Sequence, residues 1–309
     1  MSDKLQKILF QKANARGSLV ELSDAWTEML SHHTYPMPVT RLLGEMTAAV
    51  VLLSGSIKFN GSTVMQIHGD GPVRLLVVEC SNTMQIRATA KIHEELPVKD
   101  TDTFSSLVNA NGKGRCIITL DPHEKIPGQR PYQGIISLEG ETVSEVLENY
   151  MKRSEQLDTR IWLAADSTHA RGVMLQRMPA QLDERGVALT DSKEDENAWQ
   201  HLTALASTLK VQEMLSTDIA TLQHRLFWEE DVAVFEPLQP AFHCGCNREK
   251  VSNMLKMLGQ AEVEQALQEQ GALTILCDYC GKSYRFDSID CKTLFSPVSA
   301  QETPSDTRH

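Results

Sequence analysis

The sequence has no long hydrophobic run. Its most apolar stretch, MTAAVVLL at 46–53, is eight residues long, whereas a helix that crosses a bilayer needs about 20. The N-terminal residues also lack the apolar core and the small-residue cleavage site of a secretory signal. We therefore expect a cytoplasmic protein with no membrane partner, in a compartment that keeps thiols reduced.

Positive charge is scarce as well. The 309 residues include 30 Lys and Arg against 41 Asp and Glu, which gives a formal net charge of −11. Proteins that bind nucleic acid without sequence preference neutralise its phosphates with clustered Lys and Arg. The composition therefore disfavours nucleic acid as a partner.

A catalytic constellation is missing too. We find no nucleophile with a base and an orienting residue in a known arrangement. The stretch GDGP at 69–72 is too short for a phosphate-binding loop and is typical of a hairpin turn. Neither of the close cysteine pairs has the His-x-Glu that a zinc deaminase needs. We therefore expect a protein that is not an enzyme.

Hydrophobic periodicity predicts an α+β N-terminal domain built on a mostly antiparallel sheet. Residues 22–54 have helical spacing, with a break at Pro36 and Pro38. Residues 84–92 alternate between apolar and polar side chains, as a half-buried strand does. Other strands are expected at 73–80, 115–120, 132–140, 160–165 and 172–178, with a helix at 141–153 that begins with a capping box of Thr142 and Glu145.

Composition also predicts the domain organisation. Residues 181–197 carry six acidic residues against two basic ones and few large apolar side chains, which is typical of a boundary. The helical segments that follow are too short to be stable unless they dock on another surface. We expect a core domain at 1–190, a metastable helical linker at 191–243, a small cysteine-containing domain at 244–296 and a disordered tail at 297–309.

Four of the seven cysteines form two close pairs. Cys244 and Cys246 are one residue apart, and after thirty residues come Cys277 and Cys280, two residues apart. This spacing is typical of a zinc site, because each short pair supplies two thiolates from one tight turn. Between the pairs we predict two helices and a closing hairpin, with apolar faces at Val251, Met254, Leu255 and Leu258 and at Val263, Ala266 and Leu267, and with Gly259 as the cap between them.

Two interpretations of these thiols remain open from the residues alone. The first is a purely structural zinc ribbon. The second is a reversible redox switch, because each cysteine can form a disulfide with its own near neighbour, although the Cys-x-Cys ring is strained and readily reduced. Residues 241–295 hold six basic and seven acidic residues, a net charge of −1, so they lack the basic face of a nucleic-acid-binding finger.

The remaining candidates are weaker. His243 adjoins Cys244 and is a possible substitute ligand. Cys80 and Cys116 lie on expected strands, where buried inert thiols are common, and Cys291 is expected on the last helix, either in the core or at the surface. A thiol-disulfide oxidoreductase is disfavoured because no Cys-x-x-Cys opens a helix after a strand. The main alternative function is a zinc-ribbon protein associated with RNA or translation.

Several stretches together resemble one known family. They are RGSLVELS (16–23), GDGP (69–72), YQGIISLEG (132–140), YMKRSEQL (150–157), LQRMPAQ (175–181), CGCNREK (244–250) and CDYCGKSYRF (277–286). On these stretches the chain resembles the heat shock protein 33 family, the redox-regulated holdase chaperones of bacteria. Asn247 departs from the family, in which serine is common at this position.

The resemblance implies one zinc per chain, held by Cys244, Cys246, Cys277 and Cys280 in a reduced, inactive state. It also implies disulfides Cys244–Cys246 and Cys277–Cys280 and a homodimer in the oxidised, active state. That state would hold thermally unfolding and oxidatively damaged clients without ATP and pass them to ATP-dependent chaperones. The resemblance gives no role to Cys80, Cys116 or Cys291.

Overall fold

The computed structural model describes residues 3–124, 131–179 and 192–296. The chain forms two compact units, one that ends at His243 and one that begins at Cys244. The first unit contains two sheets, and the second contains one hairpin and three helices.

One sheet of the first unit has five strands in the order β10-β1-β2-β9-β8, and all neighbours are antiparallel. Its strands are β1 (Lys4–Phe10), β2 (Ala15–Leu22), β8 (Thr159–Ala165), β9 (Ala170–Arg177) and β10 (Val232–Val234).

The other sheet has six strands in the order β11-β5-β4-β3-β6-β7. Only β11 is parallel to its neighbour. The strands of this six-stranded sheet are β3 (Gly61–His68), β4 (Val73–Ser81), β5 (Gln85–Ile92), β6 (Arg115–Pro122), β7 (Tyr132–Ser137) and β11 (Ala241–Phe242).

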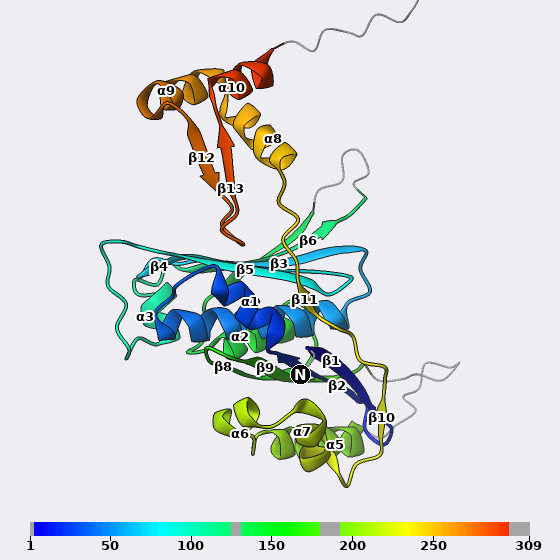
Figure 1. Ribbon diagram of the computed structural model, residues 1–309. Coiled ribbons are helices and arrows are strands. Elements are labelled where there is room, and N and C mark those ends of the chain that lie inside the picture. The colour runs from blue at the N-terminus through cyan, green and yellow to red at the C-terminus, as the bar shows by residue number, and fades with distance from the viewer. Residues whose placement is uncertain (1–2, 125–130, 180–191, 297–309) are drawn as a thin grey trace, which may run out of the picture. The chain divides into compact units, whose positions relative to one another are not determined.

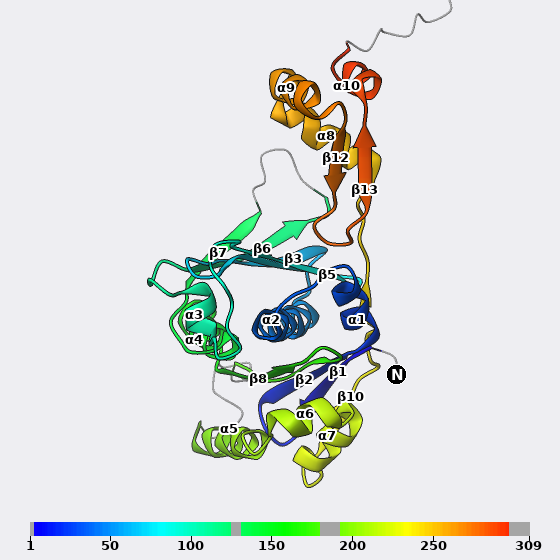
Figure 2. The same cartoon turned by 60° about the vertical axis from the view of Figure 1, so that its left-hand side comes forward.

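Helix α2 (Met37–Ser56) lies between the two sheets, and Figure 2 shows it almost end-on. Its apolar side chains point in all directions and almost all are buried, as expected of a helix enclosed on every side. By length and composition α2 is also the one helix in the described part of the chain that would be able to cross a membrane, but its burial inside the unit accounts for that composition.

Three shorter helices complete the inner part of the first unit. Helix α1 (Asp24–Ser31) precedes α2, and α3 (Phe104–Val108) and α4 (Val143–Arg153) contribute apolar side chains to the same core. This core also contains Trp26, whose side chain is fully buried and whose indole N–H donates to the Asp166 carbonyl over 2.8 Å.

The other face of the five-stranded sheet is covered by α5 (Ser192–Ala206), α6 (Val211–Ser216) and α7 (Ile219–Phe227) (Figure 1). A second apolar cluster, here called the outer cluster, fills this interface. Its buried sheet residues are Ile8, Phe10, Ala15, Leu19, Ala164, Val173 and Leu175, and its buried helix residues are Trp199, Leu202, Ala206, Met214, Ile219, Leu222, Leu226 and Phe227.

The second unit consists of α8 (Arg248–Leu258), α9 (Gln260–Gln270), the hairpin of β12 (Leu273–Leu276) and β13 (Ser283–Phe286), and α10 (Ser288–Phe295). Its buried core is small. It comprises Leu255, Val263, Leu273, Tyr284, Phe286 and Cys291.

The predicted α+β class with mostly antiparallel sheets is confirmed, and each strand expected in the first unit overlaps an observed one. The capping box before α4 is only half correct. The Thr142 hydroxyl accepts from the Glu145 N–H over 3.1 Å, but the Glu145 carboxylate accepts from Glu141 rather than from Thr142.

Other expectations were incomplete or wrong. Strands β1 and β2 were not predicted, and β10 and β11 lie in a segment read as helical. Leu258 is 56% exposed instead of buried, because it ends α8 just before the turn at Gly259, where φ is 99°. Most of the predicted boundary at 181–197 and the whole tail at 297–309 lie outside the described residues.

Candidate metal and redox centre

Cys244 and Cys246 lie on the turn that leads into α8. Asn247 is the N-cap of this helix, and its side-chain oxygen accepts from the Lys250 N–H over 2.8 Å. The Lys250 ammonium donates to the carbonyl of Gly245, between the two cysteines, over 2.7 Å. The turn is therefore held in place by the helix that it starts.

Cys277 and Cys280 lie on the turn between β12 and β13. The Cys277 N–H donates to the Lys282 carbonyl, and the Gly281 N–H donates to the Cys277 carbonyl, each over 2.9 Å. Gly281 has a φ of 65°, a left-handed conformation that glycine adopts without strain. The hairpin turn thus presents both thiols at the end of the two strands.

The structure brings all four thiols together. Their sulfur atoms all lie within 4.8 Å of one another. Two contacts join one pair to the other, with 3.6 Å from Cys244 to Cys277 and 3.4 Å from Cys246 to Cys280. Ligands at about 2.3 Å from a tetrahedral zinc ion lie about 3.8 Å apart, so the all-sulfur group fits zinc.

Tyr284 was missed as part of this site. It lies on β13, and its hydroxyl donates to the Cys246 sulfur over 3.1 Å. Burial alone would raise the pKa of Cys246, but the hydrogen bond from Tyr284 and those from the other three thiols outweigh it and lower the pKa to about 7. For Cys244, burial dominates and the pKa rises to about 12. The first pair therefore contains one thiol close to the thiolate form that binds metal.

The other thiols lie outside this cluster, and all seven cysteines are free in the structure. Cys80 and Cys116 are buried in the sheet of the first unit, and burial raises the pKa of each to about 12. Cys291 is buried on α10. His243 is not a member of the group, and its backbone N–H donates to Ile86 in the first unit.

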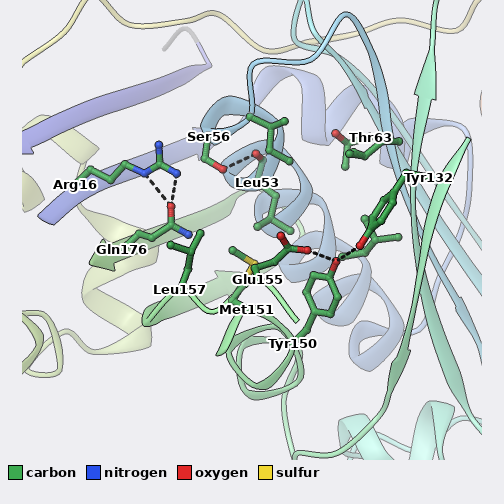
Figure 3. Close-up of a pocket in the computed structure, with 13 residues that line it drawn as sticks. Arg16, Leu53, Ser56, Thr63, Tyr132, Tyr150, Met151, Glu155, Leu157 and Gln176 are labelled. Atoms are coloured by element: carbon green, nitrogen blue, oxygen red, sulfur yellow. Dashed lines mark hydrogen bonds between the residues drawn. The ribbon is translucent and has the colours of Figure 1, made fainter. Parts of the chain in front are cut away.

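Four of the stretches that carry the family resemblance contribute residues to a pocket in the first unit (Figure 3), namely 16–23, 132–140, 150–157 and 175–181. The pocket has a volume of about 340 Å³ and is lined by residues that include Arg16, Tyr132, Tyr150, Glu155 and Gln176. Arg16 Nε donates to the Gln176 side-chain oxygen over 2.8 Å, and the Tyr150 hydroxyl donates to Glu155 over 2.7 Å. The first contact links β2 to β9, and the second links α4 to the loop that follows it.

Comparison with known proteins agrees with the fold. A family model described as Hsp33 protein matches residues 3–287. The chain belongs to the Hsp33 family. Membership places this Hsp33 chain in a family of chaperones, and the resemblance seen in the sequence is confirmed.

Curated relatives of this Hsp33 align over its full length. A 33 kDa chaperonin from Methylobacillus flagellatus is 43% identical over 297 residues, which are 96% of this chain and 95% of that protein. One from Pseudomonas paraeruginosa is 44% identical over 309 residues, 100% of this chain and 99% of that protein. The crystal structure of a 33 kDa chaperonin from Thermotoga maritima shares the fold, with a TM-score of 0.75 at 20% identity, over 94% of this chain and 97% of the other.

Proposed function

We propose that this Hsp33 is an ATP-independent holdase chaperone that is inactive when reduced and zinc-bound, and active when oxidised. The observation that carries the proposal is the cluster of four thiols on two turns of a unit with a very small core. It is supported by membership of a chaperone family.

One zinc ion per chain, held by Cys244, Cys246, Cys277 and Cys280, would supply the link between the two turns. The six buried residues of the second unit offer little apolar stabilisation of their own. Structural zinc contributes about 10 to 16 kcal/mol to the folding of such small domains. We therefore assign residues 244–296 as a domain whose folded state depends on its thiolates.

Oxidation would act on the thiols within each pair. Cys244 with Cys246, and Cys277 with Cys280, would each lose two electrons to one molecule of an oxidant such as peroxide, which takes two protons from solvent and is reduced to two waters. A bound zinc ion would leave as Zn²⁺. Sulfurs joined in a disulfide no longer serve as thiolate ligands. The two turns then lose their connection, and the second unit unfolds.

The linker at 191–243 would transmit this change to the core at 1–190. Helices α5, α6 and α7 cover an apolar face of the five-stranded sheet, and β11 ends one residue before His243, which adjoins Cys244. Leu222, Leu226 and Phe227 are buried in this interface, whereas Trp228 is 67% exposed. Release of the linker would uncover the outer cluster, which then binds unfolding clients.

The oxidised protein would act as a homodimer that holds clients until ATP-dependent chaperones accept them. Two experiments test this proposal. In the first, light scattering follows the aggregation of a thermally unfolding test protein in the presence of this chaperone, which has or has not been pretreated with peroxide. We expect suppression only after pretreatment, and equal suppression by the reduced protein would overturn the redox control. In the second, sedimentation of the same samples reports whether a dimer forms on oxidation.

A further inference from the structure

A buried ion pair lies on the outer face of the five-stranded sheet. Glu21 on β2 and Arg171 on β9 are directly opposite each other in the antiparallel register. Their side chains are 6% and 3% exposed, and Arg171 Nη2 lies 2.5 Å from Glu21 Oε1. Along these strands the pair is on the same face as Leu19 and Val173 of the outer cluster.

The pair also forms hydrogen bonds with main-chain atoms of the linker. Arg171 Nη1 donates to the Met214 carbonyl over 2.8 Å and to the Thr217 carbonyl. The Ile219 N–H donates to Glu21 Oε2 over 3.3 Å. These atoms belong to the end of α6 and the start of α7, where helices leave carbonyls and N–H groups without partners in their own helix.

This arrangement makes docking of the linker sensitive to small displacements. The pair is removed from water only while α6 and α7 are in place, and Arg171 Nε has no hydrogen-bond partner among the described residues. A buried charge that loses one of its partners is strongly destabilising, whereas a well-packed apolar pair in its place is often neutral or stabilising. The linker is therefore either fully seated or released.

We propose that Glu21 and Arg171 form a main-chain binding site for a helix-to-helix corner of a peptide. In the resting protein the corner of α6 and α7 occupies the site. In the released protein the corner of an unfolding client, with apolar side chains on either side, takes its place. The hydrogen bonds printed between the pair and the described linker all go to main-chain atoms, so the same bonds are open to many sequences. The apolar cluster beside the pair favours client segments whose apolar side chains have become exposed. The client half of this inference rests on the proposed function.

The first test uses full-length, reduced, zinc-loaded protein and measures hydrogen exchange of residues 211–227. In Arg171→Met, which leaves the Glu21 charge without its partner, we expect exchange to be at least about tenfold faster. In the double variant Glu21→Leu with Arg171→Met, we expect exchange as slow as in the wild type or slower. Arg225→Met removes an exposed pair with Glu213 in the same segment and should change exchange less than about twofold.

The single and double variants are expected to differ in the exchange rate of 211–227, so the test still decides if one of them folds poorly. Protection of β4 and β9 in each variant reports whether the core is intact. If Arg171→Met and the double variant both leave exchange of 211–227 unchanged in a folded core, the pair does not hold the linker and the inference is overturned.

The second test uses the oxidised full-length protein and a synthetic peptide of residues 208–229, with a scrambled peptide of the same composition as its control. We expect the peptide to bind the wild type, to compete with an unfolding test protein, and to bind Arg171→Met about tenfold more weakly, because that variant leaves the Glu21 charge without its partner. Equal binding to both proteins, or equal binding of the scrambled peptide, overturns the client half. If oxidation leaves 211–227 protected in the wild type, the proposed function fails instead, and the first test still decides the role of the pair.

Discussion

The two units of this Hsp33 are stabilised in different ways. In the first unit, the enclosed helix α2 packs between two sheets. The core of this unit includes large side chains such as Trp26, Met46 and Leu52. In the second, the buried core has only six members among the described residues, with partly buried side chains such as Cys246 and Met254 packed against them. We therefore expect the first unit to fold on its own, whereas the proposed function requires the second to depend on bonds made by its thiols.

The stabilities of the two units should differ most when one of the proposed metal ligands is removed. In Cys277→Ser we expect the second unit to lose most of about 10 kcal/mol of metal-linked stability and to unfold, while the strands of the first unit keep their protection. Hydrogen exchange of 248–295 and of 61–92 measures both effects in one sample. Zinc content close to one per chain in the wild type, with only sulfur ligands by X-ray absorption, is the matching control. Loss of protection in 61–92 would contradict the independence of the first unit.

Within the first unit, the inner core and the outer cluster should respond differently to truncation. Leu222 on α7 is 1% exposed and belongs to the outer cluster. We expect Leu222→Ala to cost about 2 to 5 kcal/mol, and to speed exchange only in 192–227, because the sheet keeps its inner face packed on α2. Val234→Ala, at a side chain that is 54% exposed, is the control and should change little. Uniform loss of protection across both sheets would show that the linker and the core unfold as one.

Alkaline pH should weaken the first unit through its buried thiols. Burial raises the pKa of Cys80 and Cys116 from the ordinary value of 9.0 to about 12, so the folded protein keeps protons that the unfolded chain releases. Stability should therefore be unaffected below about pH 9 and fall between pH 9 and 12 by about 1.4 kcal/mol per pH unit for each thiol. Urea unfolding of the wild type and of Cys80→Ala at pH 8 and pH 10.5 measures the slope. An unchanged slope in the variant would mean that this thiol is not the source.

The smallest expected effect is at the helix cap beside the thiols. Asn247 caps α8 through its side-chain oxygen, and a serine hydroxyl can accept the same bond. We expect Asn247→Ser to change the stability of the zinc-loaded second unit by only a few tenths of a kcal/mol, and Asn247→Ala to lower it by about 1 kcal/mol. Thermal unfolding followed by exchange in 248–258 distinguishes the two. If both variants lowered the stability of the second unit equally, capping would not be the role of Asn247.

The parts of the fold with regular local patterns could be predicted from the sequence. Alternation at 84–92 and the helical spacing of 143–153 correspond to β5 and α4, and the cysteine spacing identified the four thiols that the structure brings together. Strand β10 is three residues long and exists because it pairs with β1, more than two hundred residues away, so no local pattern indicates it. Likewise, the bond from Tyr284 to Cys246 depends on the hairpin placing the tyrosine beside the first cysteine pair.

The pairing of β1 with β10 also has a consequence for the biosynthesis of the chain. Strand β2 pairs with β9, and β1 remains an edge until residues 232–234 have left the ribosome. Contacts between such distant residues form slowly, because a long loop must close before they contribute. The five-stranded sheet therefore cannot be complete until about three quarters of the protein has been translated. Until then, the nascent chain presents an open strand edge and the apolar face that α5 to α7 later cover.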